Sequence, residues 1–317
     1  MQSCERRRGT LSPSALFIAF AAVFLALPSN ARGGKQQDSS ASHSPAEDFH
    51  LPTSANDLVR QAIDNELKQT IGDEKYFYMV HKLSGSGEQI KEYVETDEGA
   101  VGRLVAMNGK PLPADQMRKE DMHLQKLATD PETKSKHRKE QLEDEERTTK
   151  MLQAMPDAFI FQYEGTEDSP QYGTLVRLQF KPNPNFDPPS RETQIYRGME
   201  GTMLIDAAEK RLVKIDAHLT QEVTFGWGIF GHLDKGGAFV VEQSKISPRR
   251  WETTMLEIKF TGRVLLFKKL NIDEKELTGD FHPAPPHLSL EEGINVLKQQ
   301  NPQLAQDRNS VPKATAK

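Results

Sequence analysis

The segment RLVKIDAHLTQEVTFGW, residues 211–227, alternates apolar and polar side chains almost without interruption. Successive side chains of a β-strand point to opposite faces, so this period of two predicts a strand with one buried face. Gln221 is the one polar residue among the apolar positions, which are Val213, Ile215, Ala217, Leu219, Val223, Phe225 and Trp227. Burial of a single face is typical of antiparallel sheets, which favours that arrangement here.

Strand and turn patterns continue on both sides of this segment. Residues 201–206 predict a partner strand, and residues 206–210 predict the hairpin turn that joins the two. The glycines among large aromatic side chains at 226–231 predict a bent or bulged strand, and Lys235-Gly236-Gly237 predicts a turn. Further strands are predicted over residues 238–246, 251–261 and 262–269.

The N-terminal half of the chain contributes one helix and five more strands. The helix is predicted from Ser54 or Asn56 to about Thr70, because apolar residues recur there at helical spacing: Leu58, Ala62, Ile63, Leu67 and Ile71. The strands are predicted over residues 75–83, 88–96, 100–108, 159–164 and 173–180. Ten or eleven consecutive strands result, and consecutive strands usually pair as antiparallel neighbours.

Residues 111–155 differ in character from the strands around them and predict a charged helical insertion. Between residues 118 and 150 there are nine Lys or Arg residues and nine Asp or Glu residues. Pro131 divides the insertion into two helices, with short apolar stripes at Met117, Leu124, Leu127 and Ala128 and at Leu142, Leu152 and Met155. Such a charge run is usually a solvated helical face, and the alternative is a mobile lid or a partner-binding arm.

These patterns predict an α+β fold that is mostly antiparallel β, with a curved open sheet or incomplete β-barrel and helices as its lid. Residues 55–288 form a single β-rich domain in this interpretation. Residues 271–279 are interpreted as a short charged segment and residues 282–287 as extended chain. Residues 289–317 are predicted to be a short helix capped by Ser289, followed by a disordered tail.

Residues 1–31 have the three parts of a secretory signal peptide. Three arginines at 6–8 precede an apolar run of thirteen residues, 15–27, and small residues stand before the expected cleavage point after Ala31. An uncleaved membrane anchor is the alternative, but thirteen residues are too few to span a bilayer comfortably. Residues 32–54 are interpreted as a disordered linker. The chain is therefore expected to be exported, to the periplasm or the extracellular space, and to have no transmembrane segment after cleavage.

Composition and motifs argue against several classes of function. The net charge of −5 argues against nucleic-acid binding, which needs a clustered basic face. Cys4 is the only cysteine and precedes the cleavage point, so disulfides and thiol chemistry are not expected in the mature chain. No Gly-x-Ser-x-Gly elbow or phosphate-binding glycine loop is present, and nothing in the sequence selects a catalytic pair among its many carboxylates. His218 and His232 lack the spacing of a metal motif, so we expect no enzyme, no cofactor and no metal site.

Large aromatic residues at the apolar positions of the predicted strands are the remaining candidates for a functional site. A curled sheet could leave part of its apolar face for a ligand, with walls formed by Phe161, Phe225, Trp227, Phe239 and Phe260. For any one of these residues the alternative is simple packing in the core. A groove of this kind would suit a lipid or an acylated molecule.

The layout resembles that of a known superfamily. A leader, an amphipathic helix and a run of antiparallel strands interrupted by helices, with GTMLID at 201–206 followed by KRLVKI at 210–215, are similar to the periplasmic lipoprotein carriers and the related sigma-factor regulator domains. Uncharacterised secreted bacterial proteins with segments similar to 225–228 and 235–237 resemble the chain more closely. The resemblance implies an incomplete β-barrel whose apolar concave face, lidded by helices, holds acyl chains.

Two functions fit these observations best, and a third, a hydrolase acting through carboxylates, would need a pair of them facing one another in a cleft. The first is an exported, non-enzymatic binding protein that holds a lipid or a lipidated protein in an apolar concave sheet. The second is an envelope sensor or protein-interaction module that binds an envelope protein and no lipid. The charged insertion and the absence of a lipobox cysteine are departures from the superfamily pattern.

Overall fold

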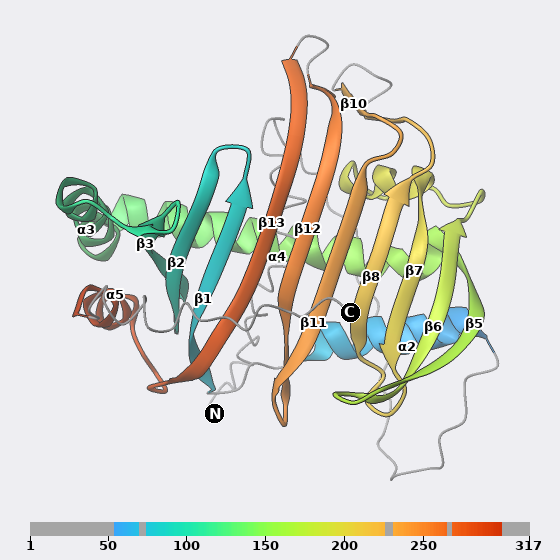
Figure 1. Cartoon of the computed structure of the whole chain (residues 1–317), viewed down its shortest axis with the longest axis horizontal. Helices are drawn as coiled ribbons and strands as arrows, with labels where there is room; N and C mark the ends of the chain where they lie inside the picture. Colours follow the sequence, from blue (N-terminus) through green and yellow to red (C-terminus); the bar gives the residue numbers. More distant parts are fainter. Residues whose placement is uncertain (1–53, 70–73, 226–230, 265–267, 300–317) are drawn as a thin grey trace, which may run out of the picture.

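The computed structural model describes residues 54–69, 74–225, 231–264 and 268–299. Its strands form one open antiparallel sheet that is not closed into a barrel, with the order β4-β3-β2-β1-β13-β12-β11-β8-β7-β6-β5 (Figure 1). Two short strands lie off this path, since β10 pairs with β12 and with β9. The predicted α+β class and the open antiparallel sheet are confirmed. The predicted signal peptide and most of the linker lie outside the described residues.

Thirteen strands make up the sheet, against the ten or eleven that were predicted. Their bounds are β1 (Lys75–Ser84), β2 (Gly87–Thr96), β3 (Gly99–Met107), β4 (Lys110–Pro111), β5 (Phe159–Ser169), β6 (Gly173–Pro182), β7 (Met199–Asp206), β8 (Leu212–Leu219), β9 (Val223–Phe225), β10 (Gly231–Leu233), β11 (Ala238–Ser247), β12 (Arg250–Val264) and β13 (Lys268–Ala284).

The described helices lie on both faces of this sheet. They are α2 (Ala55–Lys68), α3 (Ala114–Thr129), α4 (Pro131–Ala158), the 3-10 helix η1 (Glu192–Gly198) and α5 (Leu290–Gln299). Figure 1 shows α4 running across the strands, with α2 beside it over the half of the sheet that ends at β5. The helices α3 and α5 lie at the opposite end, beside β3. No helix in the described part of the chain is both long and apolar enough to cross a membrane.

The hairpin of β7 and β8 confirms most of the predicted alternation. Its turn forms as predicted, with the amide of Lys210 donating to the carbonyl of Asp206 at 2.9 Å. A register shift between Leu204 and Ile205 changes the face on which the start of β8 lies. Leu212 therefore packs in the main core, whereas Val213 packs in a separate cluster with Trp251. The prediction that Val213 shares a face with the later apolar residues of β8 was wrong, because bulges re-aim side chains.

Two hydrophobic cores lie between the helices and the sheet. The main core contains α2 and the last turns of α4, packed on strands β5 to β8, β11 and β12. The second core lies on the opposite face of the sheet, where α3 and α5 pack on Phe77, Val94 and Val101 of β1, β2 and β3. The predicted cap of α5 is present, because the hydroxyl of Ser289 accepts from the amide of Glu292 and the carboxylate of Glu292 accepts from the amide of Ser289.

The charged insertion forms the two helices that Pro131 was predicted to divide. Asp130 caps α4, since its carboxylate accepts from the amide of Thr133 at 3.0 Å. The buried residues of α4 all lie in its last turns, from Met151 to Ala158. Leu142 was predicted to be part of an apolar stripe, but its side chain is 46% exposed. The middle of α4 thus has a mostly polar surface.

The strand β13 was not predicted. Residues 271–279 and 282–284 belong to one strand of 17 residues, and the strand predicted over 262–269 is divided between β12 and β13. β13 lies between β1 and β12 and pairs with both. None of its residues is buried, so it lacks the alternation by which strands are recognised in a sequence.

Candidate functional site

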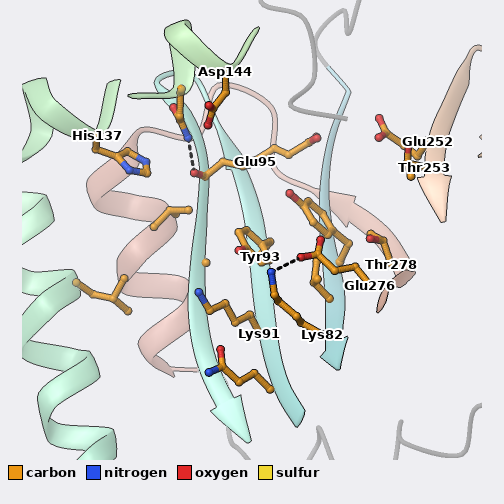
Figure 2. A pocket seen from close by; sticks show the side chains of 18 of the residues that line it. Lys82, Lys91, Tyr93, Glu95, His137, Asp144, Glu252, Thr253, Glu276 and Thr278 are labelled. Carbon is orange, nitrogen blue, oxygen red and sulfur yellow. Dashed lines mark hydrogen bonds and ion pairs between the residues drawn. The ribbon is translucent and has the colours of Figure 1, made fainter. Parts of the chain in front are cut away.

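A cavity of about 410 Å³ lies beside the main core, on the same face of the sheet, beneath α3 and α4. We call it the central cavity (Figure 2). Its floor is this face of strands β1, β2, β3, β12 and β13, and its roof is formed by α3 and α4. The cavity exists because β13 carries no buried side chains there and because the middle of α4 is polar.

Three aromatic rings from adjacent strands form the floor. Phe281 of β13 stacks on Tyr78 of β1 with ring centroids 5.6 Å apart, and Tyr78 stacks on Tyr93 of β2 at 5.2 Å. Tyr93 lies over Gly102 of β3, where a Cβ would be 2.5 Å from the ring. Residues opposite each other on one sheet face interact in this way. We call this row the aromatic ladder.

The roof is apolar on α3 and polar on α4. Leu124 and Leu127 of α3 line the cavity and are buried. Gln141 of α4 donates from Nε2 to the carbonyl of Ala100 at 2.8 Å, which holds α4 close to β3. Gly99 permits this approach, because it has a φ of +118° and a Cβ there would lie 2.0 Å from Gln141 Oε1.

A buried ionic cluster closes one side of the cavity. Arg250 is 3% exposed; its Nη1 donates to Glu95 at 2.9 Å, its Nη2 pairs with the same carboxylate, and its Nε donates to Glu252 at 2.7 Å. Glu95 and Glu252 both line the cavity (Figure 2). Burial disfavours the charged guanidinium, but the two carboxylates hold the pKa of Arg250 above its ordinary value. Arg250 also lies 5.0 Å from the ring centroid of Tyr76.

Two lysines stand at the other end. Lys82 lies between two carboxylates of β13, 2.6 Å from Glu274 and 3.0 Å from Glu276. Burial lowers the pKa of Lys82, but these carboxylates raise it by more, so Lys82 remains charged. Lys91 also lines the cavity and makes no ion pair with any residue that the structure describes. Among the described lysines that line the cavity, Lys91 is the one without an ion-pair partner, so it is available to an anionic group.

Three cavity-lining residues carry buried polar atoms that have no hydrogen-bond partner among the described residues: Thr253 Oγ1, His137 Nε2 and Gln141 Oε1. Thr253 is 2% exposed. Burial lowers the pKa of His137, which favours its neutral imidazole. Each unsatisfied buried group costs about 1–3 kcal/mol, so a bound ligand that paired with them would recover this energy.

The phenol of Tyr93 gives a pH test of the floor. Burial first, and then the negative charge of Glu276, raise the pKa of Tyr93 from 10.0 to about 12. Because the folded-state pKa exceeds the unfolded-state pKa, the phenol's contribution to stability is complete below pH 10 and is lost as the pH rises toward 12. Ultraviolet titration should show a late tyrosinate that is missing from Tyr93→Phe. Titration of Tyr93 at its ordinary pKa would contradict the buried floor.

The residues that the sequence singled out lie elsewhere. Four of them are buried in the main core, none lines the central cavity, and their exposed fractions range from 1% to 5%: Phe161, Phe225, Phe239 and Phe260. Phe239 lines a second space among core side chains, which measures only about 10 Å³. Trp227 lies outside the described residues. A ligand-binding role for these residues stays a prediction, while the geometry shows that the four described ones pack together.

Sequence reasoning missed most of the central cavity. The turn at residues 84–87 implies the register of the first hairpin, and that register places Tyr78 opposite Tyr93. This part of the ladder could have been found. The position of Thr253 in the cavity could not have been predicted. Thr254 has no partner on β11, and the resulting bulge interrupts the alternation of β12.

No family model matches the chain, and no curated protein or solved structure matches it either. The functional argument therefore rests on the geometry of the central cavity and on the polar and charged groups that line it.

Proposed function

We propose that this chain is a non-enzymatic binding protein that holds an amphipathic ligand, a lipid or an acylated molecule, in the central cavity. About 410 Å³ lies within the range of roughly 300–1,000 Å³ that is usual for ligand pockets. The aromatic ladder and the leucines of α3 offer an apolar surface to the body of the ligand. Lys91 offers a positive charge to an anionic head group.

The unpartnered hydroxyl of Thr253 is the observation that carries this proposal. A side chain that is 2% exposed and faces a cavity usually finds a hydrogen-bond partner. Thr253 stands beside the charged cluster of Arg250, on the opposite side of the ladder from α3. A ligand whose polar group reaches Thr253 while its apolar body covers Tyr78 and Leu127 would satisfy both kinds of surface.

The proposal keeps the superfamily resemblance but changes the position of the ligand. The helices α2 and α4, laid across one face of an open antiparallel sheet, are the feature that is consistent with the resemblance to the lipoprotein carriers. The apolar face over strands β5 to β8 is filled by α2 and the end of α4. The ligand therefore lies beside the main core on the same sheet face, where α2 and the end of α4 do not fill the space.

Filling the cavity tests the proposal. Val80 lines the cavity and is half-buried, so Val80→Trp should weaken binding of a fluorescent fatty acid by about tenfold or more, because the indole occupies the ligand's space. Val240→Trp is the matched control. Val240 is also half-buried within a strand, but both of its neighbours in sequence pack in the main core, so its side chain lies on the other sheet face. Displacement titration with both folded variants measures the difference.

Thr253→Val separates recognition from stability. The change removes an unpartnered hydroxyl with little change of shape, so the ligand-free protein should unfold at an equal or higher denaturant concentration. Affinity for the fatty acid should fall by about tenfold, the value of one neutral hydrogen bond. If neither Val80→Trp nor Thr253→Val changes binding, the ligand does not lie in the central cavity. If the unmodified chain binds no amphiphile, the interaction module becomes the better proposal.

A further inference from the structure

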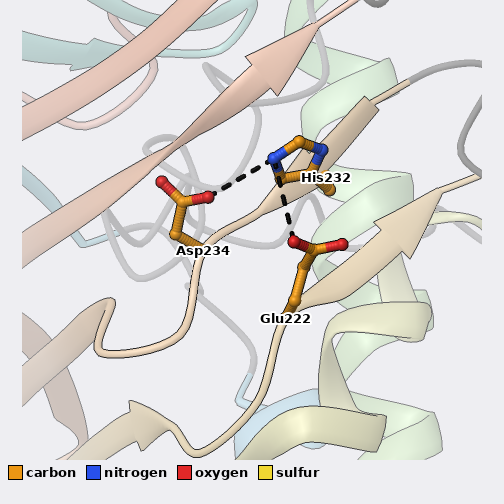
Figure 3. Close-up of side chains that lie close together, drawn as sticks. All are labelled: Glu222, His232 and Asp234. Carbon is orange, nitrogen blue, oxygen red and sulfur yellow. Dashed lines mark ion pairs between the residues drawn. The ribbon is translucent and has the colours of Figure 1, made fainter.

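Three potential metal ligands converge at the short hairpin of β9 and β10. The ligand atoms of Glu222, His232 and Asp234 lie within 4.8 Å of one another. His232 Nε2 is 3.3 Å from Asp234 Oδ1 and 4.0 Å from Glu222 Oε2 (Figure 3). None of the three lines the central cavity.

The register of the hairpin explains why they converge. Leu233 pairs with Val223, and Asp234 and Glu222 follow directly at the next position on the two strands. Val223 and Leu233 pack in the main core, so the residues next to them point to the opposite, solvent-facing side. His232 is two residues from Asp234 on the same strand and pairs with Thr224, so it points to the same side. The arrangement places two carboxylates opposite each other, which is unfavourable unless a positive charge lies between them.

We propose that Glu222, His232 and Asp234 bind a divalent transition-metal ion, for which Zn²⁺ is the probe. One imidazole nitrogen and two carboxylate oxygens are ligands that zinc accepts. Zinc–ligand bonds of about 2.0–2.2 Å in a tetrahedral arrangement hold the ligand atoms roughly 3.3–3.6 Å apart. The distance of 3.3 Å between His232 Nε2 and Asp234 Oδ1 already lies in this range. The distance of 4.0 Å between His232 Nε2 and Glu222 Oε2 is longer, and a small rotation of the Glu222 side chain would shorten it.

The surroundings of Asp234 support the assignment. Oδ2 of Asp234 accepts from the hydroxyl of Thr261 on β12 at 2.7 Å, which leaves Oδ1 directed at His232. Hydrogen bonds of this kind orient the carboxylate ligands of metal sites. Arg263 is unfavourable for metal binding. It is the backbone pairing partner of His232 between β10 and β12, so it brings a positive charge to the same side of the sheet. Its side chain is exposed, so solvent screens this charge.

Zinc titration of the full chain by isothermal calorimetry tests the site. We expect one site that is tighter than the background of other histidines, and we expect it to be lost in His232→Ala and Glu222→Gln. Thr261→Val should weaken it by about tenfold, as for other partners that orient a ligand. Arg263→Gln should tighten it, because a repelling charge is removed.

His218→Ala is the matched control. His218 is an exposed strand histidine 3.5 Å from the carboxylate of Glu200, but it has no second carboxylate within ion-pair distance among the described residues. This variant should keep the tight site. Equal zinc binding by His232→Ala and the unmodified chain would overturn the proposal, as would the absence of any tight site. The three residues would then be a surface cluster of polar side chains that binds no metal. Circular dichroism confirms that each variant is folded.

Discussion

Replacing Arg250 with methionine is expected to lower the free energy of unfolding by about 3–5 kcal/mol. The guanidinium is 3% exposed and is the ion-pair partner of Glu95 and Glu252, which are 7% and 6% exposed. Without it, two carboxylates remain buried beside each other with no compensating charge. Urea denaturation at neutral pH measures the loss.

The neighbouring arginine is the control for this prediction. Arg249 pairs with Glu74 at 2.8 Å, but its side chain is 83% exposed. Arg249→Met should therefore cost no more than about 1 kcal/mol, since exposed ion pairs contribute little. Adding Glu95→Gln and Glu252→Gln to the Arg250 variant should recover part of its loss, because the uncompensated charges are removed. Equal costs for the two arginine variants would contradict a buried ionic cluster.

Replacing Phe260 with alanine is expected to cost about 3–5 kcal/mol of stability and to leave ligand affinity unchanged. Phe260 is 1% exposed in the main core, and its ring lies so close to Gly237 that a Cβ there would be 2.2 Å from it. The side chain has no surface in the central cavity. Denaturation and fatty-acid titration on the same folded sample measure the two effects separately.

Phe281→Ala should give the opposite pattern. Phe281 is only half-buried and forms the outer member of the aromatic ladder, so its loss should weaken binding more than stability. The two phenylalanine variants together distinguish the groove expected from the sequence from the cavity seen in the structure. If the folded Phe260→Ala variant bound the fatty acid more weakly, the ligand site would instead lie on the apolar face of the main core.

Local patterns predicted the strands and turns whose side chains divide clearly between a buried and an exposed face. The alternation from Ile215 to Phe225 and the turns near Lys210 and Gly236 follow from the period of two and from turn chemistry alone. The division of the insertion at Pro131 follows from the geometry of proline. In each case the information lies within a few neighbouring residues.

The rest depends on pairings between distant residues. Arg250 lies 155 positions from Glu95, so no local pattern indicates that they form one ionic cluster. The strand β13 escapes recognition for a related reason, since its pairing with β1 and β12 replaces the apolar face that usually marks a strand. The central cavity combines both effects, because residues from five strands and two helices form it.

The position of β13 has a consequence for how the molecule is made. Lys75 at the start of β1 pairs with Ala284 at the end of β13. The first strand therefore cannot complete its pairing until the last strand has been synthesised. During synthesis the ten residues of β1 have β2 on one side and an open hydrogen-bonding edge on the other. Pairings at such long sequence separation form slowly, and open edges invite association with other chains. The β1–β3 end can therefore pair with the main body only after β13 has been made, and until then the edge of β1 is open to association with other chains.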